Sequence, residues 1–254
     1  MTLDRIAELL QPFLTAPCHS EPGRRRGEEP AFPPSCENAR QAAELSPSQL
    51  QYISTYIDLL LRWNARINLT AIRDPEEIVT RHFGESLFAA RCLFPSAPST
   101  PFTVADIGSG AGFPGLPIRL WAPQIALTLI ESNHKKATFL REVTRALTLT
   151  NVNIRIARAE SLIEPSQTRS AQSAFASPSF DVVTMRAVER FESILAGAMS
   201  LLAPQGRLAL LISAAQLNTA QRHPAVGSAN LSWQAAVPVP SSQTRIVAIA
   251  QRAE

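Results

Sequence analysis

The chain has 254 residues, 45% of them apolar, so it can form one large domain with a sizeable core, or a domain and a small cap. Its formal net charge of +3 and its pI of about 9.0 permit a nucleic-acid partner without requiring one. The sequence has no apolar run of the roughly 18 residues that a membrane span needs, no signal peptide, and no metal-like spacing among its three cysteines, which predicts a cytoplasmic protein without a membrane or metal partner.

Residues 1–45 are predicted to hold one short helix followed by a flexible insertion. Residues 3–14, "LDRIAELLQPFL", have the spacing of an amphipathic helix. Residues 16–41 are rich in proline and charge and lack apolar periodicity, so they are not expected to join the core. Within them, "GRRRGEE" is interpreted as a solvated loop whose charges neutralise one another, rather than as an RNA-binding arm.

Two capping boxes predict a pair of helices in the next segment. Ser46 is followed by Gln49, and Asp74 by Glu77, each three residues on and each with a proline at the first helical position. Apolar residues then recur at helical spacing. We therefore predict a helical cap over residues 46–98.

The remaining residues, 99–254, are predicted to form a Rossmann-like domain. Apolar β-like runs alternate with helical segments, which indicates a mostly parallel sheet with helices on both faces. The predicted strands lie at 102–107, 125–130, 152–156, 180–185, 207–212 and 245–250, and the predicted helices at 115–121, 133–147 and 189–202. Two low-complexity stretches, 165–179 and 214–243, are predicted to be surface loops.

Four glycines crowd the loop after the first strand, in "VADIGSGAGFPG". Ligands of doubly wound sheets bind beyond the carboxyl ends of the strands, so this loop is the predicted ligand site. Gly110-x-Gly112-x-x-Gly115 satisfies the dinucleotide pattern. A dinucleotide loop, however, starts its glycines directly at the strand end, and starting at Gly108 puts Phe113 where the third glycine belongs. The register therefore disfavours a nicotinamide cofactor.

Acidic residues at successive strand ends favour S-adenosylmethionine instead. Asp106 ends the first strand and is placed to help bind the ammonium group of the cofactor, directly or through water. Glu131 ends the second strand and is placed to accept both ribose hydroxyls. Ala159 and Glu160 follow the third strand, where the adenine ring would lie. Each acid alone is commonly a surface or capping group, and only their joint placement carries this prediction.

Three segments of the chain resemble one family. "LLRWNARINLTAIRDPEEIVTRHFGESL", "DIGSGAGFPGLPI" and "FDVVTMRAV" are similar to segments of the RsmG (GidB) family, the bacterial methyltransferases of small-subunit ribosomal RNA, and the resemblance spans about residues 46–212. It implies a class I methyltransferase with a Rossmann-like fold and an N-terminal helical cap. It also implies that S-adenosylmethionine donates a methyl group to N7 of a guanine in the 530 loop of 16S RNA.

The resemblance also assigns residues. Arg186 matches the family's Arg-Ala at the mouth of the active site and is the candidate catalytic residue; no general base is expected, because N7 bears no proton. The predicted cofactor-binding residues are Asp106, Gly108, Ser109, Gly110, Gly112, Phe113, Glu131, Ala159, Glu160 and Arg186. The predicted RNA-binding residues are Arg66, Arg73, Arg81 and His82. Asn64 and Asn68 match family asparagines, but asparagines beside a helix end often cap it.

Two departures from the family concern the RNA contacts more than the cofactor site. The family usually has aspartate where this chain has Glu85, and a Lys-Gly commonly follows its fifth strand, where this chain has Leu211, Ile212 and Ser213. Three alternatives stay open: a methyltransferase of another substrate, a non-catalytic RNA-binding protein, and an NAD(P)-dependent oxidoreductase. The expected partner is 16S RNA or the 30S particle, and the expected state is a monomer.

Overall fold

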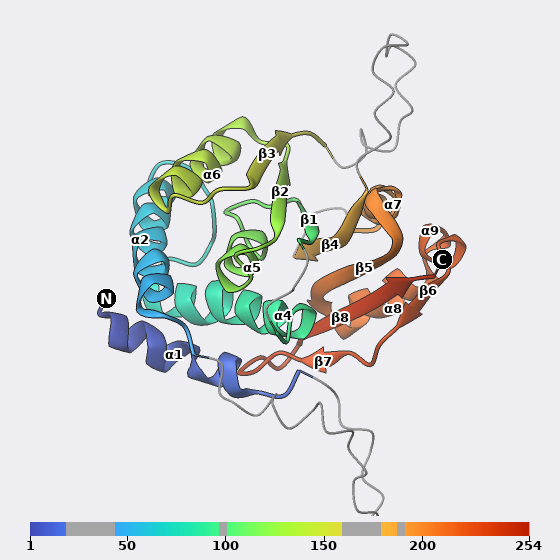
Figure 1. Cartoon of the computed structure of the whole chain (residues 1–254), viewed down its shortest axis with the longest axis horizontal. Helices are drawn as coiled ribbons and strands as arrows, with labels where there is room; N and C mark the ends of the chain where they lie inside the picture. Colours follow the sequence, from blue (N-terminus) through green and yellow to red (C-terminus); the bar gives the residue numbers. More distant parts are fainter. Residues whose placement is uncertain (19–43, 97–100, 159–178, 187–190, 254) are drawn as a thin grey trace, which may run out of the picture.

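The computed structural model of the chain describes residues 1–18, 44–96, 101–158, 179–186 and 191–253 (Figure 1). Within them, eight strands form one sheet in the order β3-β2-β1-β4-β5-β8-β6, with β7 paired to β8. The strands are β1 (Thr103–Ile107), β2 (Ala126–Glu131), β3 (Val152–Ile156), β4 (Phe180–Arg186), β5 (Leu202–Ser213), β6 (Leu231–Trp233), β7 (Val237–Pro238) and β8 (Arg245–Arg252). Strands β1 to β5 are parallel, and β8 is antiparallel to β5.

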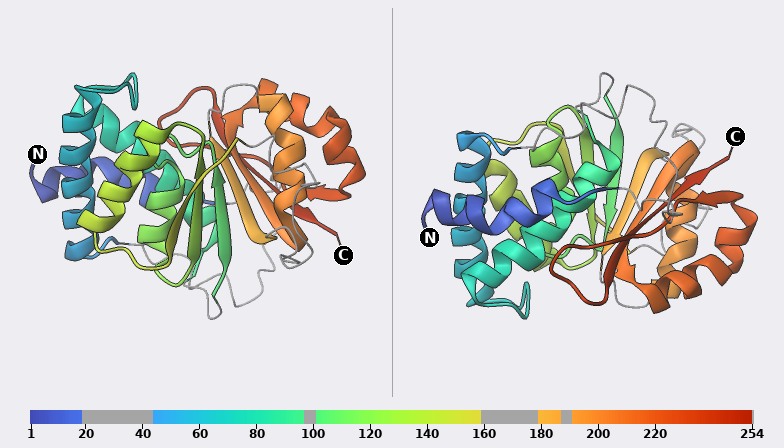
Figure 2. Two further views of the ribbon diagram at one scale, coloured as in Figure 1. Left: turned by 90° about the horizontal axis from the view of Figure 1, so that it is seen from above. Right: turned by 90° about the horizontal axis from the view of Figure 1, so that it is seen from below.

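Helices cover both faces of the sheet (Figure 2). One face carries α1 (Leu3–Thr15), α2 (Pro47–Asn64), α4 (Glu85–Leu93), α5 (Gly115–Trp121) and α6 (His134–Ala146), and the other carries α7 (Phe191–Leu201), α8 (Ala214–Arg222) and α9 (Pro224–Ser228). The short helix α3 (Pro75–Glu77) leads into η2 (Ile78–Gly84), a π-helical segment, and then directly into α4. No helix in these described parts is long and apolar enough to cross a membrane.

The predicted fold class is confirmed, and each of the six predicted strands is present. The capping box predicted at Ser46 is complete, with Gln49 as its partner at α2. The second predicted box is only half formed: Asp74 accepts a hydrogen bond from the Glu77 N–H, and the helix α3 that it caps gives way after three residues to η2. The predicted insertion and the predicted loop over 165–179 fall almost entirely outside the described residues.

The surface loop predicted over residues 214–243 is wrong. The segment contains α8, α9, β6 and β7. Helix α8 begins at a capping box of the same kind as that of α2, formed by Ser213 and Gln216. It buries Ala220, whereas β6 and β7 are only three and two residues long and depend on pairing with β8.

The N-terminal helix α1 packs into the cap. Its side chains Ile6, Leu10 and Phe13 are buried, and the Phe13 ring lies so close to Gly84 that a Cβ there would be 2.5 Å from it. Arg91 of α4 donates from Nη1 to the carbonyl oxygens of Phe13 and Ala16 at 2.8 and 2.9 Å. These contacts fix the helices that carry η2 beside the glycine-rich loop.

Candidate cofactor and substrate site

A cavity of about 630 Å³ opens at the carboxyl ends of the parallel strands. The strand order reverses between β1 and β4, so the cavity lies at the switch point where doubly wound sheets bind ligands. The predicted site residues that line it are Gly108, Ser109, Gly110, Phe113, Glu131, His82 and Arg186. Asp106, Gly112, Arg66, Arg73 and Arg81 are not among its lining residues, and Ala159 and Glu160 lie outside the described residues.

Two glycines of the loop have different surroundings. Gly110 has φ +56°, and a Cβ built on it would have only the Gly108 carbonyl oxygen nearby, at 3.7 Å. Gly112 has φ +90°, and a Cβ there would collide with the Tyr56 hydroxyl and lie 2.6 Å from Leu116 Cδ1. Gly110 therefore keeps space open at the cavity, while Gly112 allows the cap to pack against the loop.

Asp106 lies beneath the loop instead of in the cavity. Its side chain is fully buried, Oδ2 accepts a hydrogen bond from the Gly115 N–H at 3.2 Å, and Oδ1 accepts one from the Thr184 hydroxyl at 2.9 Å. Burial raises the pKa of Asp106 from 3.8 to about 7, against the opposing effect of these hydrogen bonds. The carboxyl group thus joins the start of α5 to β4 and supports the loop from below.

Asp106→Asn is expected to change how stability depends on pH. Because the folded chain keeps this proton up to about pH 7 and the unfolded chain loses it near pH 4, the free energy of unfolding falls as pH rises through that window and is constant above it. Asparagine removes this contribution, so the stability of the wild type relative to Asp106→Asn should fall by about 2–4 kcal/mol between pH 4 and 8. Urea unfolding of both proteins across this range measures it; parallel curves would contradict it.

Glu131 is held as an acceptor at the end of β2. Its Oε2 accepts from the Gly110 N–H at 2.8 Å and its Oε1 from the Asn133 N–H at 2.7 Å. The side chain lines the cavity, and a carboxylate has about four acceptor sites, so capacity remains for hydroxyl groups of a ligand. The two backbone hydrogen bonds fix the carboxylate in the place expected for a ribose.

An aromatic stack joins the cap to the loop. The Phe113 ring lies between Tyr56 of α2, at 5.3 Å between centroids, and His82 of η2, at 4.7 Å, with interplanar angles of 6° and 20°. The buried Tyr56 hydroxyl also donates to the Ala111 carbonyl oxygen. Tyr56 was not among the predicted site residues, although its position on the apolar face of α2 was a usable signal.

His82 forms part of the cavity wall. Its Nε2 is 2.8 Å from the Thr70 hydroxyl, which belongs to the segment between α2 and α3. Asn64 orders this segment by accepting hydrogen bonds from the N–H groups of Leu69 and Thr70. Burial, followed by the charges of Arg186 and the neighbouring arginines, lowers the pKa of His82 to about 3. His82 is therefore neutral at physiological pH, and Asn64 has a structural role.

Glu85, at the start of α4, is the centre of an ion cluster at the other side of the cavity. It is 2% exposed, and its Oε2 is 3.0 Å from Arg186 Nη2 and 3.2 Å from Arg245 Nη1. Arg81 reaches Oε1 at 3.4 Å. Burial lowers the pKa of Arg186 to about 10, so its guanidinium stays charged at neutral pH. Glu85 stood out in the sequence only as a departure from the family, and Arg245, which lines the cavity, carries no local motif.

The predicted RNA-binding arginines lie outside the cavity. Arg66 and Arg73 are exposed on the segment between α2 and α3. Arg81 is 45% exposed and is shared between Glu85 and Glu77, whose Oε1 lies 3.4 Å away. Among the residues that the structure describes, no group of histidine, cysteine and acidic side chains is arranged to hold a metal ion.

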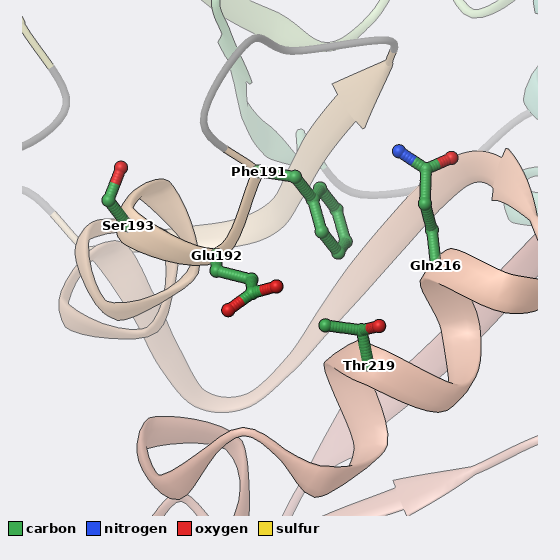
Figure 3. Close-up of a pocket in the computed structure, with 5 residues that line it drawn as sticks. All are labelled: Phe191, Glu192, Ser193, Gln216 and Thr219. Carbon is green, nitrogen blue, oxygen red and sulfur yellow. The ribbon is translucent and has the colours of Figure 1, made fainter.

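A second, more open cavity of about 510 Å³ lies between α7 and α8 (Figure 3). The Phe191 ring points into the space between the two helices, and the Ser193 hydroxyl points away from it. Its other lining residues are Glu192, Gln216 and Thr219. None of the predicted site residues lines this cavity, so the cavity at the switch point is the candidate functional site.

Solved structures with this fold include methyltransferases. Magnesium protoporphyrin IX methyltransferase (ChlM) from Synechocystis PCC 6803, solved with bound SAM, is 13% identical with a TM-score of 0.54, covering 80% of this chain and 97% of that one. A predicted O-methyltransferase from Agrobacterium tumefaciens is 20% identical with a TM-score of 0.50, covering 67% and 81%. At these identities the likeness shows the fold alone.

Sequence comparisons are more specific. "Ribosomal RNA small subunit methyltransferase G" of Xanthomonas campestris pv. campestris (strain B100) is 40% identical over 182 residues, covering 70% of this chain and 77% of that protein. The protein of the same name from Xylella fastidiosa (strain M23) is 47% identical over 121 residues, covering 48% and 54%. The family described as "GidB: rRNA small subunit methyltransferase G" matches residues 49–245. The chain therefore belongs to the GidB family of small-subunit ribosomal RNA methyltransferases.

Proposed function

We propose that the cavity at the switch point is where the chain methylates N7 of a guanine in the 530 loop of 16S RNA, with S-adenosylmethionine as the methyl donor. The observation that carries this proposal is the family match over residues 49–245. The match contains the glycine-rich loop and nearly all of the helical cap that packs against this loop. The cofactor supplies an electrophilic methyl group on a sulfonium.

The residues of the cavity fit this cofactor. Glu131, fixed by two backbone N–H groups, is proposed to accept the ribose hydroxyls, and the backbone at Gly108 and Gly110 leaves room for the amino-acid end. Asp106 supports the loop from beneath. Ala159 and Glu160 stay proposed adenine contacts.

Catalysis is proposed to depend on positioning and on exclusion of water, not on a base. Guanine N7 has a free lone pair and no proton to lose, so holding it in line with the methyl carbon and sulfur provides the rate gain. Arg186 donates to Glu85 and to the carbonyl oxygens of Arg81 and His82, and so fixes the cavity wall beside β4. The exposed Arg66, Arg73 and Arg81 are proposed to bind RNA phosphates.

The proposal is tested by incubating the purified chain with radiolabelled S-adenosylmethionine and either 16S RNA or 30S particles from a strain lacking the protein. Mapping of N7-methylguanine in the product should place the label in the 530 loop. Binding without transfer would favour a non-catalytic RNA-binding protein, and label elsewhere would favour another substrate.

We further propose that the chain acts as a cytoplasmic monomer.

The rate of methyl transfer should be nearly independent of pH between about pH 6.5 and 8.5. The nucleophile has no proton, and His82 is already neutral in this range because its pKa is lowered to about 3. Asp106, whose pKa of about 7 falls inside the range, is buried beneath the loop and does not line the cavity. Single-turnover rates with RNA and cofactor prebound measure this. His82→Gln should keep the flat profile and lose less than the roughly 100-fold that removing a general base costs. A rise through neutrality that disappears in His82→Gln would contradict a mechanism without a base.

A further inference from the structure

Charged side chains line the cavity at both of its ends. At the end of β2, where the cofactor ribose is expected, Glu131 is accompanied by Lys136 of α6 and by Arg158 after β3. Arg186 ends β4 and Arg245 begins β8, which lies beyond β5 on the opposite side of β1. The end of the cavity away from Glu131 is therefore walled by two guanidinium groups that converge on one buried carboxylate, that of Glu85.

This cluster has a surplus of positive charge. Arg81 is shared with the exposed Glu77, which leaves Glu85 between Arg186 and Arg245. One carboxylate thus faces two guanidinium groups. An excess of positive charge on the wall of a cavity favours the binding of an anion there.

The two arginines differ in the donors that they have left. Arg186 is 5% exposed, and its two terminal nitrogens donate to four acceptors of the protein, including Glu85 and the Ser86 hydroxyl. Arg245 is 26% exposed and donates a hydrogen bond from Nη1 to Glu85. Its Nη2 and Nε donate no hydrogen bond to any residue that the structure describes. Arg245 is thus the guanidinium with donors available at the cavity.

Resting on the proposed function, we propose that Arg245 binds a phosphate oxygen of the target RNA strand beside the guanine, and that Glu85 positions it. A guanidinium fork matches phosphate geometry and forms charge-assisted hydrogen bonds. The cofactor carries an ammonium and a sulfonium against one carboxylate, so its net positive charge is not attracted to this end, whereas RNA is a polyanion. Arg245 is the cross-strand neighbour of Ser213, so the sheet holds this cation beside the carboxyl end of β5.

The test compares Arg245→Gln, Arg245→Lys and the control Arg252→Gln. Arg252 lies at the opposite end of β8, about 23 Å away at the usual rise of a strand. It is also partly buried, also makes one hydrogen bond to the protein, and its loss changes the net charge equally. For each protein the KM for the 16S RNA substrate is measured at several salt concentrations, and the Kd for S-adenosylmethionine is measured without RNA.

Arg245→Gln should raise the KM for RNA about tenfold and reduce its salt slope by about 0.7–0.9, the value of one phosphate contact. The Kd of Arg245→Gln for the cofactor should stay within about twofold of the wild-type value. Arg245→Lys should recover part of the RNA affinity, because lysine keeps the charge without the fork of donors. Arg252→Gln should match the wild type. An unchanged RNA KM and salt slope would overturn the proposal. A weaker cofactor Kd with unchanged RNA dependence would assign the anion to the cofactor carboxylate instead. A wild type that methylates no 16S RNA would instead refute the proposed function.

Discussion

Gly110→Val is expected to raise the Kd for S-adenosylmethionine at least about 100-fold while leaving the fold mostly intact. Gly110 has φ +56°, which a β-branched residue strongly disfavours. The loop would relax away from this conformation and weaken the hydrogen bond from the Gly110 N–H to Glu131. The added side chain would also occupy the open space at a residue that lines the cavity. Calorimetric titration gives the Kd, and circular dichroism with thermal melting gives the fold.

Gly112→Ala is the matched control. Its Cβ would meet the Tyr56 hydroxyl, Leu116 and Leu140 in a packed region, so this smaller substitution should destabilise the whole chain by about 2 kcal/mol or more. Gly110→Ala should keep the fold and show a smaller loss of cofactor affinity. If Gly110→Val is folded and still binds the cofactor like the wild type, the cofactor does not lie at this loop.

Much of the fold could be predicted because its signals are local. The strands are short apolar runs between turns, and α2 has its capping box and apolar stripe in adjacent residues. The segment 214–243 shows where local sequence signals stop predicting the fold. The box formed by Ser213 and Gln216 was present in the sequence, but β6 and β7 are defined by pairing with β8 and carry little signal of their own.

The residues of the candidate site likewise divide into those with a local sequence signal and those without one. The loop glycines could be predicted because they follow β1 directly, and Glu131 because it is the last residue of β2. Asp106 was placed correctly at the end of β1, but β1 is buried on both faces, so its carboxyl group lies beneath the loop. Glu85 and Arg245 are 160 positions apart, and only the antiparallel insertion of β8 next to β5 brings them together. No periodicity in the sequence reports such a contact.

Glu85→Ala is expected to be the most destabilising single change at the site, by about 3–5 kcal/mol. The carboxylate is 2% exposed and compensates Arg186, which is 5% exposed and remains charged at neutral pH. Removing it leaves a buried guanidinium without its counter-ion beside a second one from Arg245, and an uncompensated buried charge costs this much. Glu85→Asp, which restores the family's usual residue, should cost much less. Urea unfolding at neutral pH measures all three proteins.

The cause of that loss can be separated from simple loss of packing by adding Arg186→Met. If the penalty comes from the stranded guanidinium, Glu85→Ala/Arg186→Met should be more stable than the sum of the single variants by at least about 1–2 kcal/mol. The double variant no longer contains the 5% exposed guanidinium of Arg186, and the Arg245 that remains is 26% exposed and can be hydrated. Recovery should be incomplete, since the carbonyl oxygens of Arg81 and His82 lose the donor that Arg186 provides. Strict additivity would mean that Glu85 acts by filling space, and Arg245 would then need no carboxylate to position it.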